Sequence, residues 1–227
     1  MSPPGPLAAG RHKLFRAASL VRGGRARNRA LDEQDVDPDP IEQFRRWISE
    51  AKAAGQPEPE AMALATATAG GAPSVRFVLM RGVDERGFVF YTNERSRKGL
   101  EMAANPLVSL AFRWWALERQ VRVEGRAVVV DPDQSDAYFA TRPRGAQLGA
   151  WASAQSETLR RRADLDESLE AVTARFAGSE VPRPPWWGGF RVEPSVVELW
   201  QGRPDRLHDR LRYSLNGTTW EIDRLSP

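Results

Sequence analysis

The sequence contains no cysteine and only two histidines, His12 and His208, among its 227 residues. Without cysteine there is no disulfide, no thiolate metal site and no cysteine nucleophile. Two histidines are too few for a histidine-rich centre, so we predict no metal site. No apolar run approaches the roughly 20 residues that cross a bilayer, so we expect a cytoplasmic protein without membrane contact. The common dinucleotide, P-loop, zinc-protease and serine-nucleophile motifs are also absent, and difficult chemistry would therefore need a cofactor.

The basic residues are unevenly distributed. The formal charge is +3, yet residues 1–30 hold seven basic residues and no acid, which leaves 26 basic and 30 acidic residues in 31–227. The first segment is rich in Pro, Gly, Ala and Arg, so we expect residues 1–34 to form a disordered basic arm and residues 35–227 to fold. Phe15 is the only aromatic residue in this arm. Nucleic-acid binding is therefore not favoured, because base stacking needs interleaved aromatics.

Local patterns predict an antiparallel, mainly β protein with flanking helices. Asp39 and Pro40 form a helix start, followed by apolar residues at helical spacing until Gly55. Further helices are predicted at 97–104, 133–141 and 156–177. Alternating or β-rich runs predict strands at 62–68, 74–81, 87–93, 107–115, 119–130, 190–192, 196–200, 211–215 and 220–222. Strands with irregular helices between them favour an antiparallel barrel of the α+β class.

Two stretches of the predicted strands and helices carry the chemistry of an anion site. Arg76 and Arg81 stand at the two ends of an otherwise apolar strand. Tyr91 and Thr92 are followed by the segment 96–98, whose serine, arginine and lysine begin a predicted helix. Helix N-termini with adjacent cations bind phosphate well. The structural alternatives are a strand whose ends reach solvent and a capped surface helix.

Two later stretches also carry side chains that could bind an anion. Tyr138 and Arg142 lie about one helical turn apart, which suits a second anion. Arg206, His208 and Arg210 alternate along a segment that we predict to be extended, so their side chains would share one face. Three like charges on one face repel unless an anion or an acid lies between them. A purely structural histidine is the alternative for this last stretch.

These stretches belong to a longer ordered set of motifs. The set comprises DPDP at 37–40, RFVLMR at 76–81, FYTN at 90–93, SRK at 96–98, LERQV at 117–121, RPR at 142–144, QLGAW at 147–151, QS at 155–156, WGGFR at 187–191, WQG at 200–202, RLHDR at 206–210 and IDRLSP at 222–227. Together they resemble the pyridoxamine/pyridoxine 5′-phosphate oxidase family. The resemblance spans about residue 35 to the C-terminus.

The resemblance implies an FMN-binding split β-barrel, a homodimer with its active sites at the subunit interface. It implies oxidation of pyridoxamine or pyridoxine 5′-phosphate to pyridoxal 5′-phosphate, with O2 reduced to H2O2. The residues implied to bind FMN are Arg76, Phe77, Val78, Leu79, Met80, Arg81, Tyr91, Thr92, Arg97 and Lys98 of one subunit, and Gln120, Gln155, Ser156, Trp200 and Arg210 of the other. The residues implied to bind substrate are Arg81, Tyr138, Arg142, Ala146, Arg206, Leu207 and His208, of which Arg206 and His208 are catalytic and lie over the pyridine ring.

Three positions depart from the usual pattern of the family. Arg81 replaces a lysine, Ala146 replaces a serine, and Gly23–Arg27 replaces a segment that carries an aromatic lid residue. At 146 one donor to a charged phosphate is lost, which is worth about 10- to 150-fold in binding. One interpretation is drift within a vitamin B6 oxidase. The others are a paralogue that oxidises a different reduced ring in secondary metabolism, as in phenazine pathways, or a non-enzymatic flavin, pyridoxal-phosphate or nucleic-acid binder.

Overall fold

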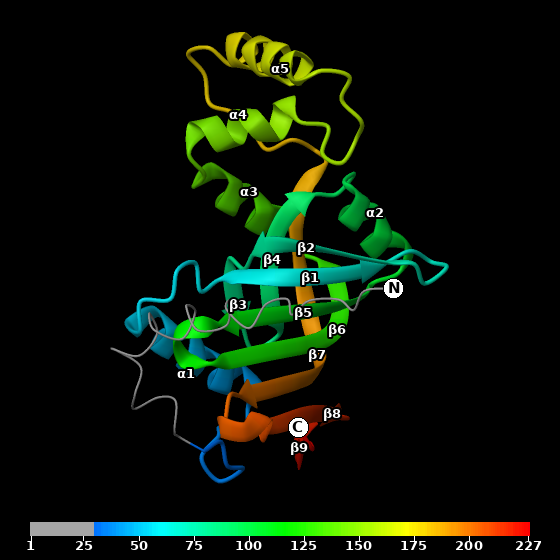
Figure 1. Cartoon of the computed structure of the whole chain (residues 1–227). Helices are drawn as coiled ribbons and strands as arrows, with labels where there is room; N and C mark the ends of the chain where they lie inside the picture. The colour runs from blue at the N-terminus through cyan, green and yellow to red at the C-terminus, as the bar shows by residue number, and fades with distance from the viewer. Residues whose placement is uncertain (1–29) are drawn as a thin grey trace, which may run out of the picture.

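A computed structural model describes residues 30–227, and its centre is a nine-stranded antiparallel sheet curled into a half-barrel (Figure 1). The strands are β1 (Ala61–Ala67), β2 (Pro73–Leu79), β3 (Gly82–Asp84), β4 (Gly87–Asn93), β5 (Leu107–Trp114), β6 (Arg119–Val129), β7 (Trp187–Gln201), β8 (Asp209–Asn216) and β9 (Thr219–Arg224). The order is β2-β1-β5-β6-β7-β4-β3, with β8 added to β7 and β9 to β8. This confirms the predicted fold class.

The longest strand, β7, was predicted as two short ones, and that prediction was wrong. Glu124 of β6 pairs with Val196 and Gly125 pairs with Pro194, so Ser195 is the extra residue of a β-bulge. A proline is tolerated at such a place, where the ladder is already interrupted. Gly125 is needed there because a Cβ would lie 2.1 Å from the carbonyl oxygen of Glu193. The bulge bends one continuous strand, so that its first half pairs with β4 and its second half with β8.

Helix α1 (Pro40–Ala53) closes the hollow side of the sheet. Asp39 is its N-cap and accepts a hydrogen bond of 2.8 Å from the amide of Ile41, as the sequence predicts. Phe44 is fully buried, and its ring lies 4.9 Å from the rings of both Phe88 and Phe112. The helix therefore anchors the aromatic core through its apolar face.

The packed part of the chain begins earlier than the predicted boundary at residue 35. Leu31 is 7% exposed and belongs to the main core, and its amide donates to Asp209 Oδ2 at 3.1 Å. The rest of the predicted arm, 1–29, lies outside the described residues. In the described part, no helix is both long and apolar enough to cross a membrane.

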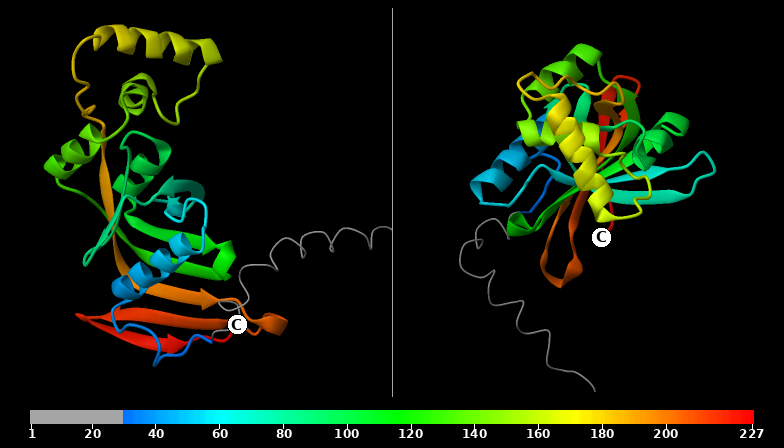
Figure 2. Two further views of the ribbon diagram at one scale, coloured as in Figure 1. Left: turned by 90° about the vertical axis from the view of Figure 1, so that its left-hand side faces the viewer. Right: turned by 90° about the horizontal axis from the view of Figure 1, so that it is seen from above.

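Three helices form a lobe at one end of the sheet, and the β8–β9 hairpin lies at the opposite end (Figures 1 and 2). The lobe consists of α3 (Pro132–Ala140), α4 (Arg144–Ala152) and α5 (Arg162–Arg175). It has its own small core, in which Phe139, Leu148 and Phe176 pack with Trp187 of β7. Helix α4 was not predicted, because two glycines lower its intrinsic helix propensity. The segment 153–161 is not helical, so α5 starts later than predicted.

Candidate active site

A cavity of about 850 Å³ lies between the lobe, the edge strand β2 and helix α2 (Arg97–Ala104). Many of the predicted site residues line it: Arg76, Phe77, Val78, Leu79, Arg81, Tyr91, Thr92, Arg97, Lys98, Tyr138, Arg142, Ala146, Gln155 and Ser156. Among the lining residues that were not predicted are Ser74, Asn93, Ser153 and Trp187. One predicted residue, Met80, is buried in the main core and is not among the cavity-lining residues.

The start of α2 forms one cationic end of this cavity. Ser96 is the N-cap, and its hydroxyl also accepts a 3.0 Å hydrogen bond from Lys98 Nζ. Lys98 donates a second bond, of 2.8 Å, to Gln155 Oε1 in the loop after α4. The lysine is 8% exposed; its burial, together with the nearby charge of Arg76, lowers its pKa to about 8. Within residues 30–227, no carboxylate is hydrogen-bonded to this buried ammonium.

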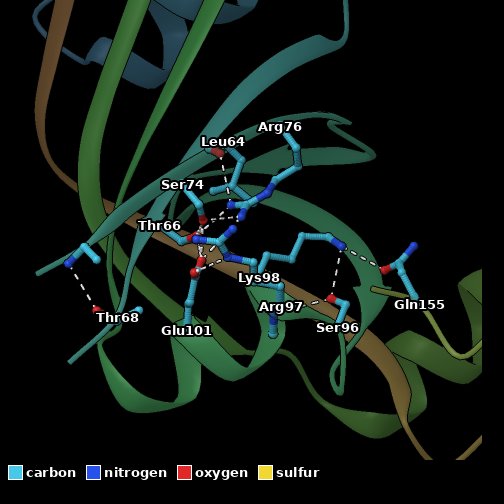
Figure 3. Close-up of polar contacts among 12 residues, drawn as sticks. Leu64, Thr66, Thr68, Ser74, Arg76, Ser96, Arg97, Lys98, Glu101 and Gln155 are labelled. Atoms are coloured by element: carbon cyan, nitrogen blue, oxygen red, sulfur yellow. Dashed lines mark hydrogen bonds and ion pairs between the residues drawn. The ribbon is translucent and has the colours of Figure 1, made fainter. Parts of the chain in front are cut away.

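Arg76 is held beside Lys98 by a network of polar side chains (Figure 3). Its Nη1 donates to the carbonyl of Leu64 at 3.2 Å and to Thr66 Oγ1 at 2.5 Å, and its Nη2 donates to Ser74 Oγ at 2.5 Å. Both arginine Nη atoms therefore have protein partners. Among the described residues, Arg76 Nε has none, so it remains available to a ligand.

A buried glutamate stands behind these cations. Glu101 Oε1 accepts from Arg97 Nε at 2.8 Å, and Glu101 Oε2 accepts from Arg76 Nη2 at 3.3 Å. Burial would raise the pKa of Glu101, but hydrogen bonds from Ser74, Thr66, Arg97 and Arg76 lower it to about 2. Sequence reasoning missed this residue. Its spacing of four residues from Arg97 on one helix was the available signal.

A second cationic group lies against the lobe. Arg142 stacks over the ring of Trp187 at 4.8 Å, and its Nη1 is buried without a hydrogen-bond partner among the described residues. Burial lowers the pKa of Arg142, and the positive charge of Arg81 lowers it further. A buried donor without a partner costs about 1–3 kcal/mol. Arg142 as a residue lines the cavity, and a buried donor without a partner in a native structure points to a bound group that satisfies it.

Aromatic rings are stacked on one another beside this second group. Tyr91 and Tyr138 stack at 4.0 Å with 13° between their planes, and Tyr91 and Trp187 stack at 5.5 Å with 7° between theirs. Rings stacked in this way cover one another's faces and form a rigid packed group. The cavity thus combines two cationic groups with a stack of aromatic side chains.

The remaining predicted residues form a separate cluster. Gln120 pairs with Trp200 and Trp200 pairs with Arg210, so they occupy adjacent positions across β6, β7 and β8. Arg113 of β5 pairs with Gln120, extends this row, and lies 5.2 Å from the Trp200 ring. The ring of His208 lies 4.5 Å from that of Trp200. None of these five residues lines the cavity.

The length of strand β7 shows how far the row that contains Trp200 lies from the cavity. Trp187 lines the cavity and Trp200 belongs to the row, 13 residues further along the same strand. At about 3.3 Å per residue this corresponds to a separation of up to about 40 Å. One copy of the chain therefore does not bring all of the predicted residues together. Gln155 and Ser156 were predicted to reach the site from the other subunit, but they line the cavity of the same chain as Lys98.

The segment around Arg206 differs from its prediction. Pro204–Arg206 is a 3-10 turn in which Asp205 and Arg206 have φ values of 56° and 63°, so the predicted extended run is wrong. Arg206 and Leu207 are exposed and lie outside the cavity. His208 Nδ1 accepts a hydrogen bond of 3.1 Å from the Arg203 amide. The proton of the neutral imidazole is therefore on Nε2, which can face a ligand.

Within residues 30–227, no group of three or more His, Cys, Asp or Glu side chains is placed to hold a metal ion.

The whole sequence is similar to one family of known proteins. Residues 48–175 match the family described as pyridoxamine 5′-phosphate oxidase, and residues 187–227 match the pyridoxine 5′-phosphate oxidase C-terminal dimerisation region. A protein of Cupriavidus taiwanensis is 57% identical over 87% of this chain and 93% of its own length. One of Rubrobacter xylanophilus is 59% identical over 87% and 91%. Both are named pyridoxine/pyridoxamine 5′-phosphate oxidase.

Solved structures give the same fold. PhzG from Burkholderia lata, in complex with tetrahydrophenazine-1-carboxylic acid, has a TM-score of 0.84 at 34% identity and covers 89% of this chain and 100% of its own. A pyridoxamine 5′-phosphate oxidase-related, FMN-binding protein from Nostoc punctiforme has a TM-score of 0.65 at 19% identity, which is a likeness of fold. With both family regions matched in sequence, the chain belongs to the pyridoxamine 5′-phosphate oxidase family of FMN-binding oxidoreductases.

Proposed function

We propose that this protein is an FMN-dependent oxidase that converts pyridoxamine or pyridoxine 5′-phosphate to pyridoxal 5′-phosphate and reduces O2 to H2O2. The observation that carries the proposal is the presence of two cationic groups in one cavity. Arg76, Arg97 and Lys98 form the first, and Arg81 and Arg142 form the second. Two anion sites suit a phosphorylated cofactor beside a phosphorylated substrate.

The residues of the first group fit the phosphate of FMN. Among the described residues, the buried ammonium of Lys98 has only neutral partners and Arg76 Nε has none. Arg97 uses Nε on Glu101, so its two Nη groups remain as donors. A phosphate monoester carries about −1.5 to −2 charges near pH 7 and three acceptor oxygens. These donors and charges match it in number and kind.

The row of Gln120, Trp200 and Arg210 would complete the site from a second copy of the chain. The match of 187–227 to a dimerisation region supports this homodimer, because β7 and β8 contribute Trp200 and Arg210. Glu198 fixes Arg210 through hydrogen bonds of 2.9 and 3.2 Å, so the guanidinium is held in place before the ligand arrives. The active sites would therefore lie at the subunit interface.

The chain's own residues bind and orient the substrate. FMN, when bound, supplies the acceptor for the hydride of the substrate and passes electrons to O2. Arg142 and Tyr138 would hold the substrate phosphate, and Arg81 adds a third donor group. Arg206 and His208 of the second copy would lie over the pyridine ring, with Leu207 beside them. His208 Nε2 is the ring nitrogen that can form a hydrogen bond with the substrate, because Nδ1 already accepts from the Arg203 amide.

Reconstitution tests the proposal directly. The purified protein should take up FMN, and under air it should form pyridoxal 5′-phosphate and H2O2 in equal amounts from pyridoxine or pyridoxamine 5′-phosphate. Failure to bind FMN would contradict every flavin-dependent function. Bound FMN without turnover of either compound would favour the second candidate below.

The second candidate is oxidation of a reduced phenazine-type ring. It is favoured by the similarity to PhzG, whose structure holds tetrahydrophenazine-1-carboxylic acid. Arg142 would then pair with a carboxylate, and the phosphate donors lost or altered at Ala146 and Arg81 would not be needed. Comparing kcat/KM for pyridoxine 5′-phosphate and for a reduced phenazine carboxylic acid separates the two candidates.

Replacing Ala146 with serine tests whether phosphate is the recognised group of the substrate. Ala146 lines the cavity on α4, four residues beyond Arg142. A new hydroxyl should lower KM for pyridoxine 5′-phosphate by about 10-fold, the low end of the worth of a hydrogen bond to a charged group. Unphosphorylated pyridoxine is the control, and its turnover should not change. An unchanged KM for the phosphate ester would argue against a phosphate at this position.

The affinity for FMN should fall as the pH rises through about 8. The free protein has Lys98 with a pKa of about 8, and the ammonium is the form that binds phosphate. Below pH 8 the lysine is already charged, whereas above it the proton must be taken up on binding, which costs up to about tenfold in affinity per pH unit. Titration of the apoprotein by flavin fluorescence measures this. Lys98→Arg should flatten the profile, because arginine stays protonated; an equally steep profile in that variant would rule out Lys98 as the titrating group.

A further inference from the structure

A buried carboxylate lies in the middle of the cationic group that would bind the cofactor phosphate. The side chain of Glu101 is 5% exposed, and its neighbours within hydrogen-bond distance include Arg76 and Arg97 (Figure 3). A negative charge at this place repels a phosphate, and burying it is costly in itself. Its presence therefore needs an explanation other than attraction of the ligand.

The hydrogen bonds around Glu101 have a fixed direction. Thr66 Oγ1 and Ser74 Oγ both donate to Glu101 Oε2, the second over 2.5 Å. A hydroxyl that donates its one proton to a carboxylate has only lone pairs left for other partners. Both hydroxyls accordingly accept from Arg76, Thr66 from Nη1 and Ser74 from Nη2. An ionised Glu101 thus orients two hydroxyls, and they in turn fix the plane of the guanidinium.

The same carboxylate holds the second arginine by a different atom. Glu101 Oε1 accepts from Arg97 Nε, which leaves both Nη groups of Arg97 without a partner among the described residues. For Arg76 the situation is reversed, because its Nη atoms are used and Nε is left. Arg76, Arg97 and Lys98 together with Glu101 carry a net charge of +2, which matches a phosphate dianion.

We propose that Glu101 is a positioning residue that holds Arg76 and Arg97 in the orientation that binds the phosphate of FMN. Thr66 and Ser74 transmit this constraint to Arg76. Preorganised donors bind more tightly because their side chains lose less freedom when the ligand arrives. The inference rests on the proposed function, since it assigns the cofactor phosphate to this group.

The isosteric variant Glu101→Gln gives results of opposite sign for the two possible roles. If the carboxylate only weakened the local positive potential, its removal would make FMN bind more tightly. If it positions the arginines, the Kd for FMN should rise about 10- to 100-fold, as expected when hydrogen bonds to a charged group are lost. Riboflavin has the same ring system and no phosphate, so its Kd should not change. Both values are measured by quenching of flavin fluorescence with the apoprotein.

Matched variants separate positioning from a loss of folding. Glu170→Gln on the exposed face of α5 removes a charge that has no ion-pair or hydrogen-bond partner within residues 30–227, and it should leave both Kd values unchanged. Ser74→Ala keeps the carboxylate and removes one bridging hydroxyl, so it should give a smaller loss that is still confined to FMN. In an Arg97→Gln background, Glu101→Gln should cost less than in the unaltered protein, because one of the two positioned groups is already gone.

The results that would overturn the positioning role differ from those that would contradict the proposed function. Tighter FMN binding by Glu101→Gln, or an equal loss for FMN and riboflavin in both Glu101→Gln and Ser74→Ala, would overturn the positioning role. An unchanged FMN Kd would overturn it as well. In each of these cases the unaltered protein still binds FMN, whereas failure of the unaltered protein to bind FMN contradicts the proposed function itself.

Discussion

Two variants that are each nearly inactive should regain activity when they form a mixed dimer. Lys98→Gln alters the cavity, and Arg206→Gln alters an exposed residue outside it, which is proposed to reach the site from the second copy. Each alone should lose roughly 100-fold in kcat/KM, within the range for a lost hydrogen bond to a charged group. In a mixed dimer with interfacial sites, one site carries both changes and the other carries neither.

The size of the regained activity follows from symmetry. A pure mixed dimer, obtained by co-expression with two different affinity tags, should have about half of the unaltered activity, and random mixing should give about a quarter. Each variant co-expressed with itself under both tags is the control and should stay inactive. If the mixed dimer were as inactive as its parents, Lys98 and Arg206 would belong to the same copy's site, and the interfacial arrangement would be wrong.

The sequence predicted those parts of the fold that depend on local patterns. The bounds of β4 and α2 coincide with the predicted 87–93 and 97–104, because a run of β-forming residues after a turn, an N-cap serine and a terminal Asn-Pro all act within a few residues. The continuity of β7 was not predictable in this way. Pro194 looks like a break, and only the bulge opposite Gly125 makes it compatible with one strand.

In the candidate site, too, residues within local motifs were predicted and a residue that depends on long-range contacts was not. Arg76, Lys98 and Arg142 were identified from their local motifs, and the structure brings all three to one cavity. Glu101 was missed because its role depends on Thr66 and Ser74. Those two residues belong to different strands and face Glu101 only through the register of β1 with β2. Such contacts join positions up to 35 residues apart and leave no local signal.

Arg142→Gln should lower the activity without lowering the stability of the fold. Arg142 is proposed to bind the substrate phosphate with its planar fork, and two lost hydrogen bonds of about 1.5–3 kcal/mol each correspond to roughly 100- to 10,000-fold in kcat/KM for pyridoxine 5′-phosphate. Arg142→Lys keeps the charge but not the fork, so its loss should be intermediate. The Kd for FMN should not change in either variant, because Arg142 belongs to the second cationic group.

The stability of the same variant should not fall. In the folded protein, Arg142 Nη1 is buried without a partner, at a cost of about 1–3 kcal/mol, and glutamine removes both the charge and that donor. The lost stacking of Arg142 on Trp187, of about 0.5–2 kcal/mol, offsets part of this gain. Urea unfolding of the apoprotein should therefore give a midpoint equal to or above that of the unaltered protein. A clearly lower midpoint together with weaker FMN binding would show that Arg142 supports the fold and does not await an anion.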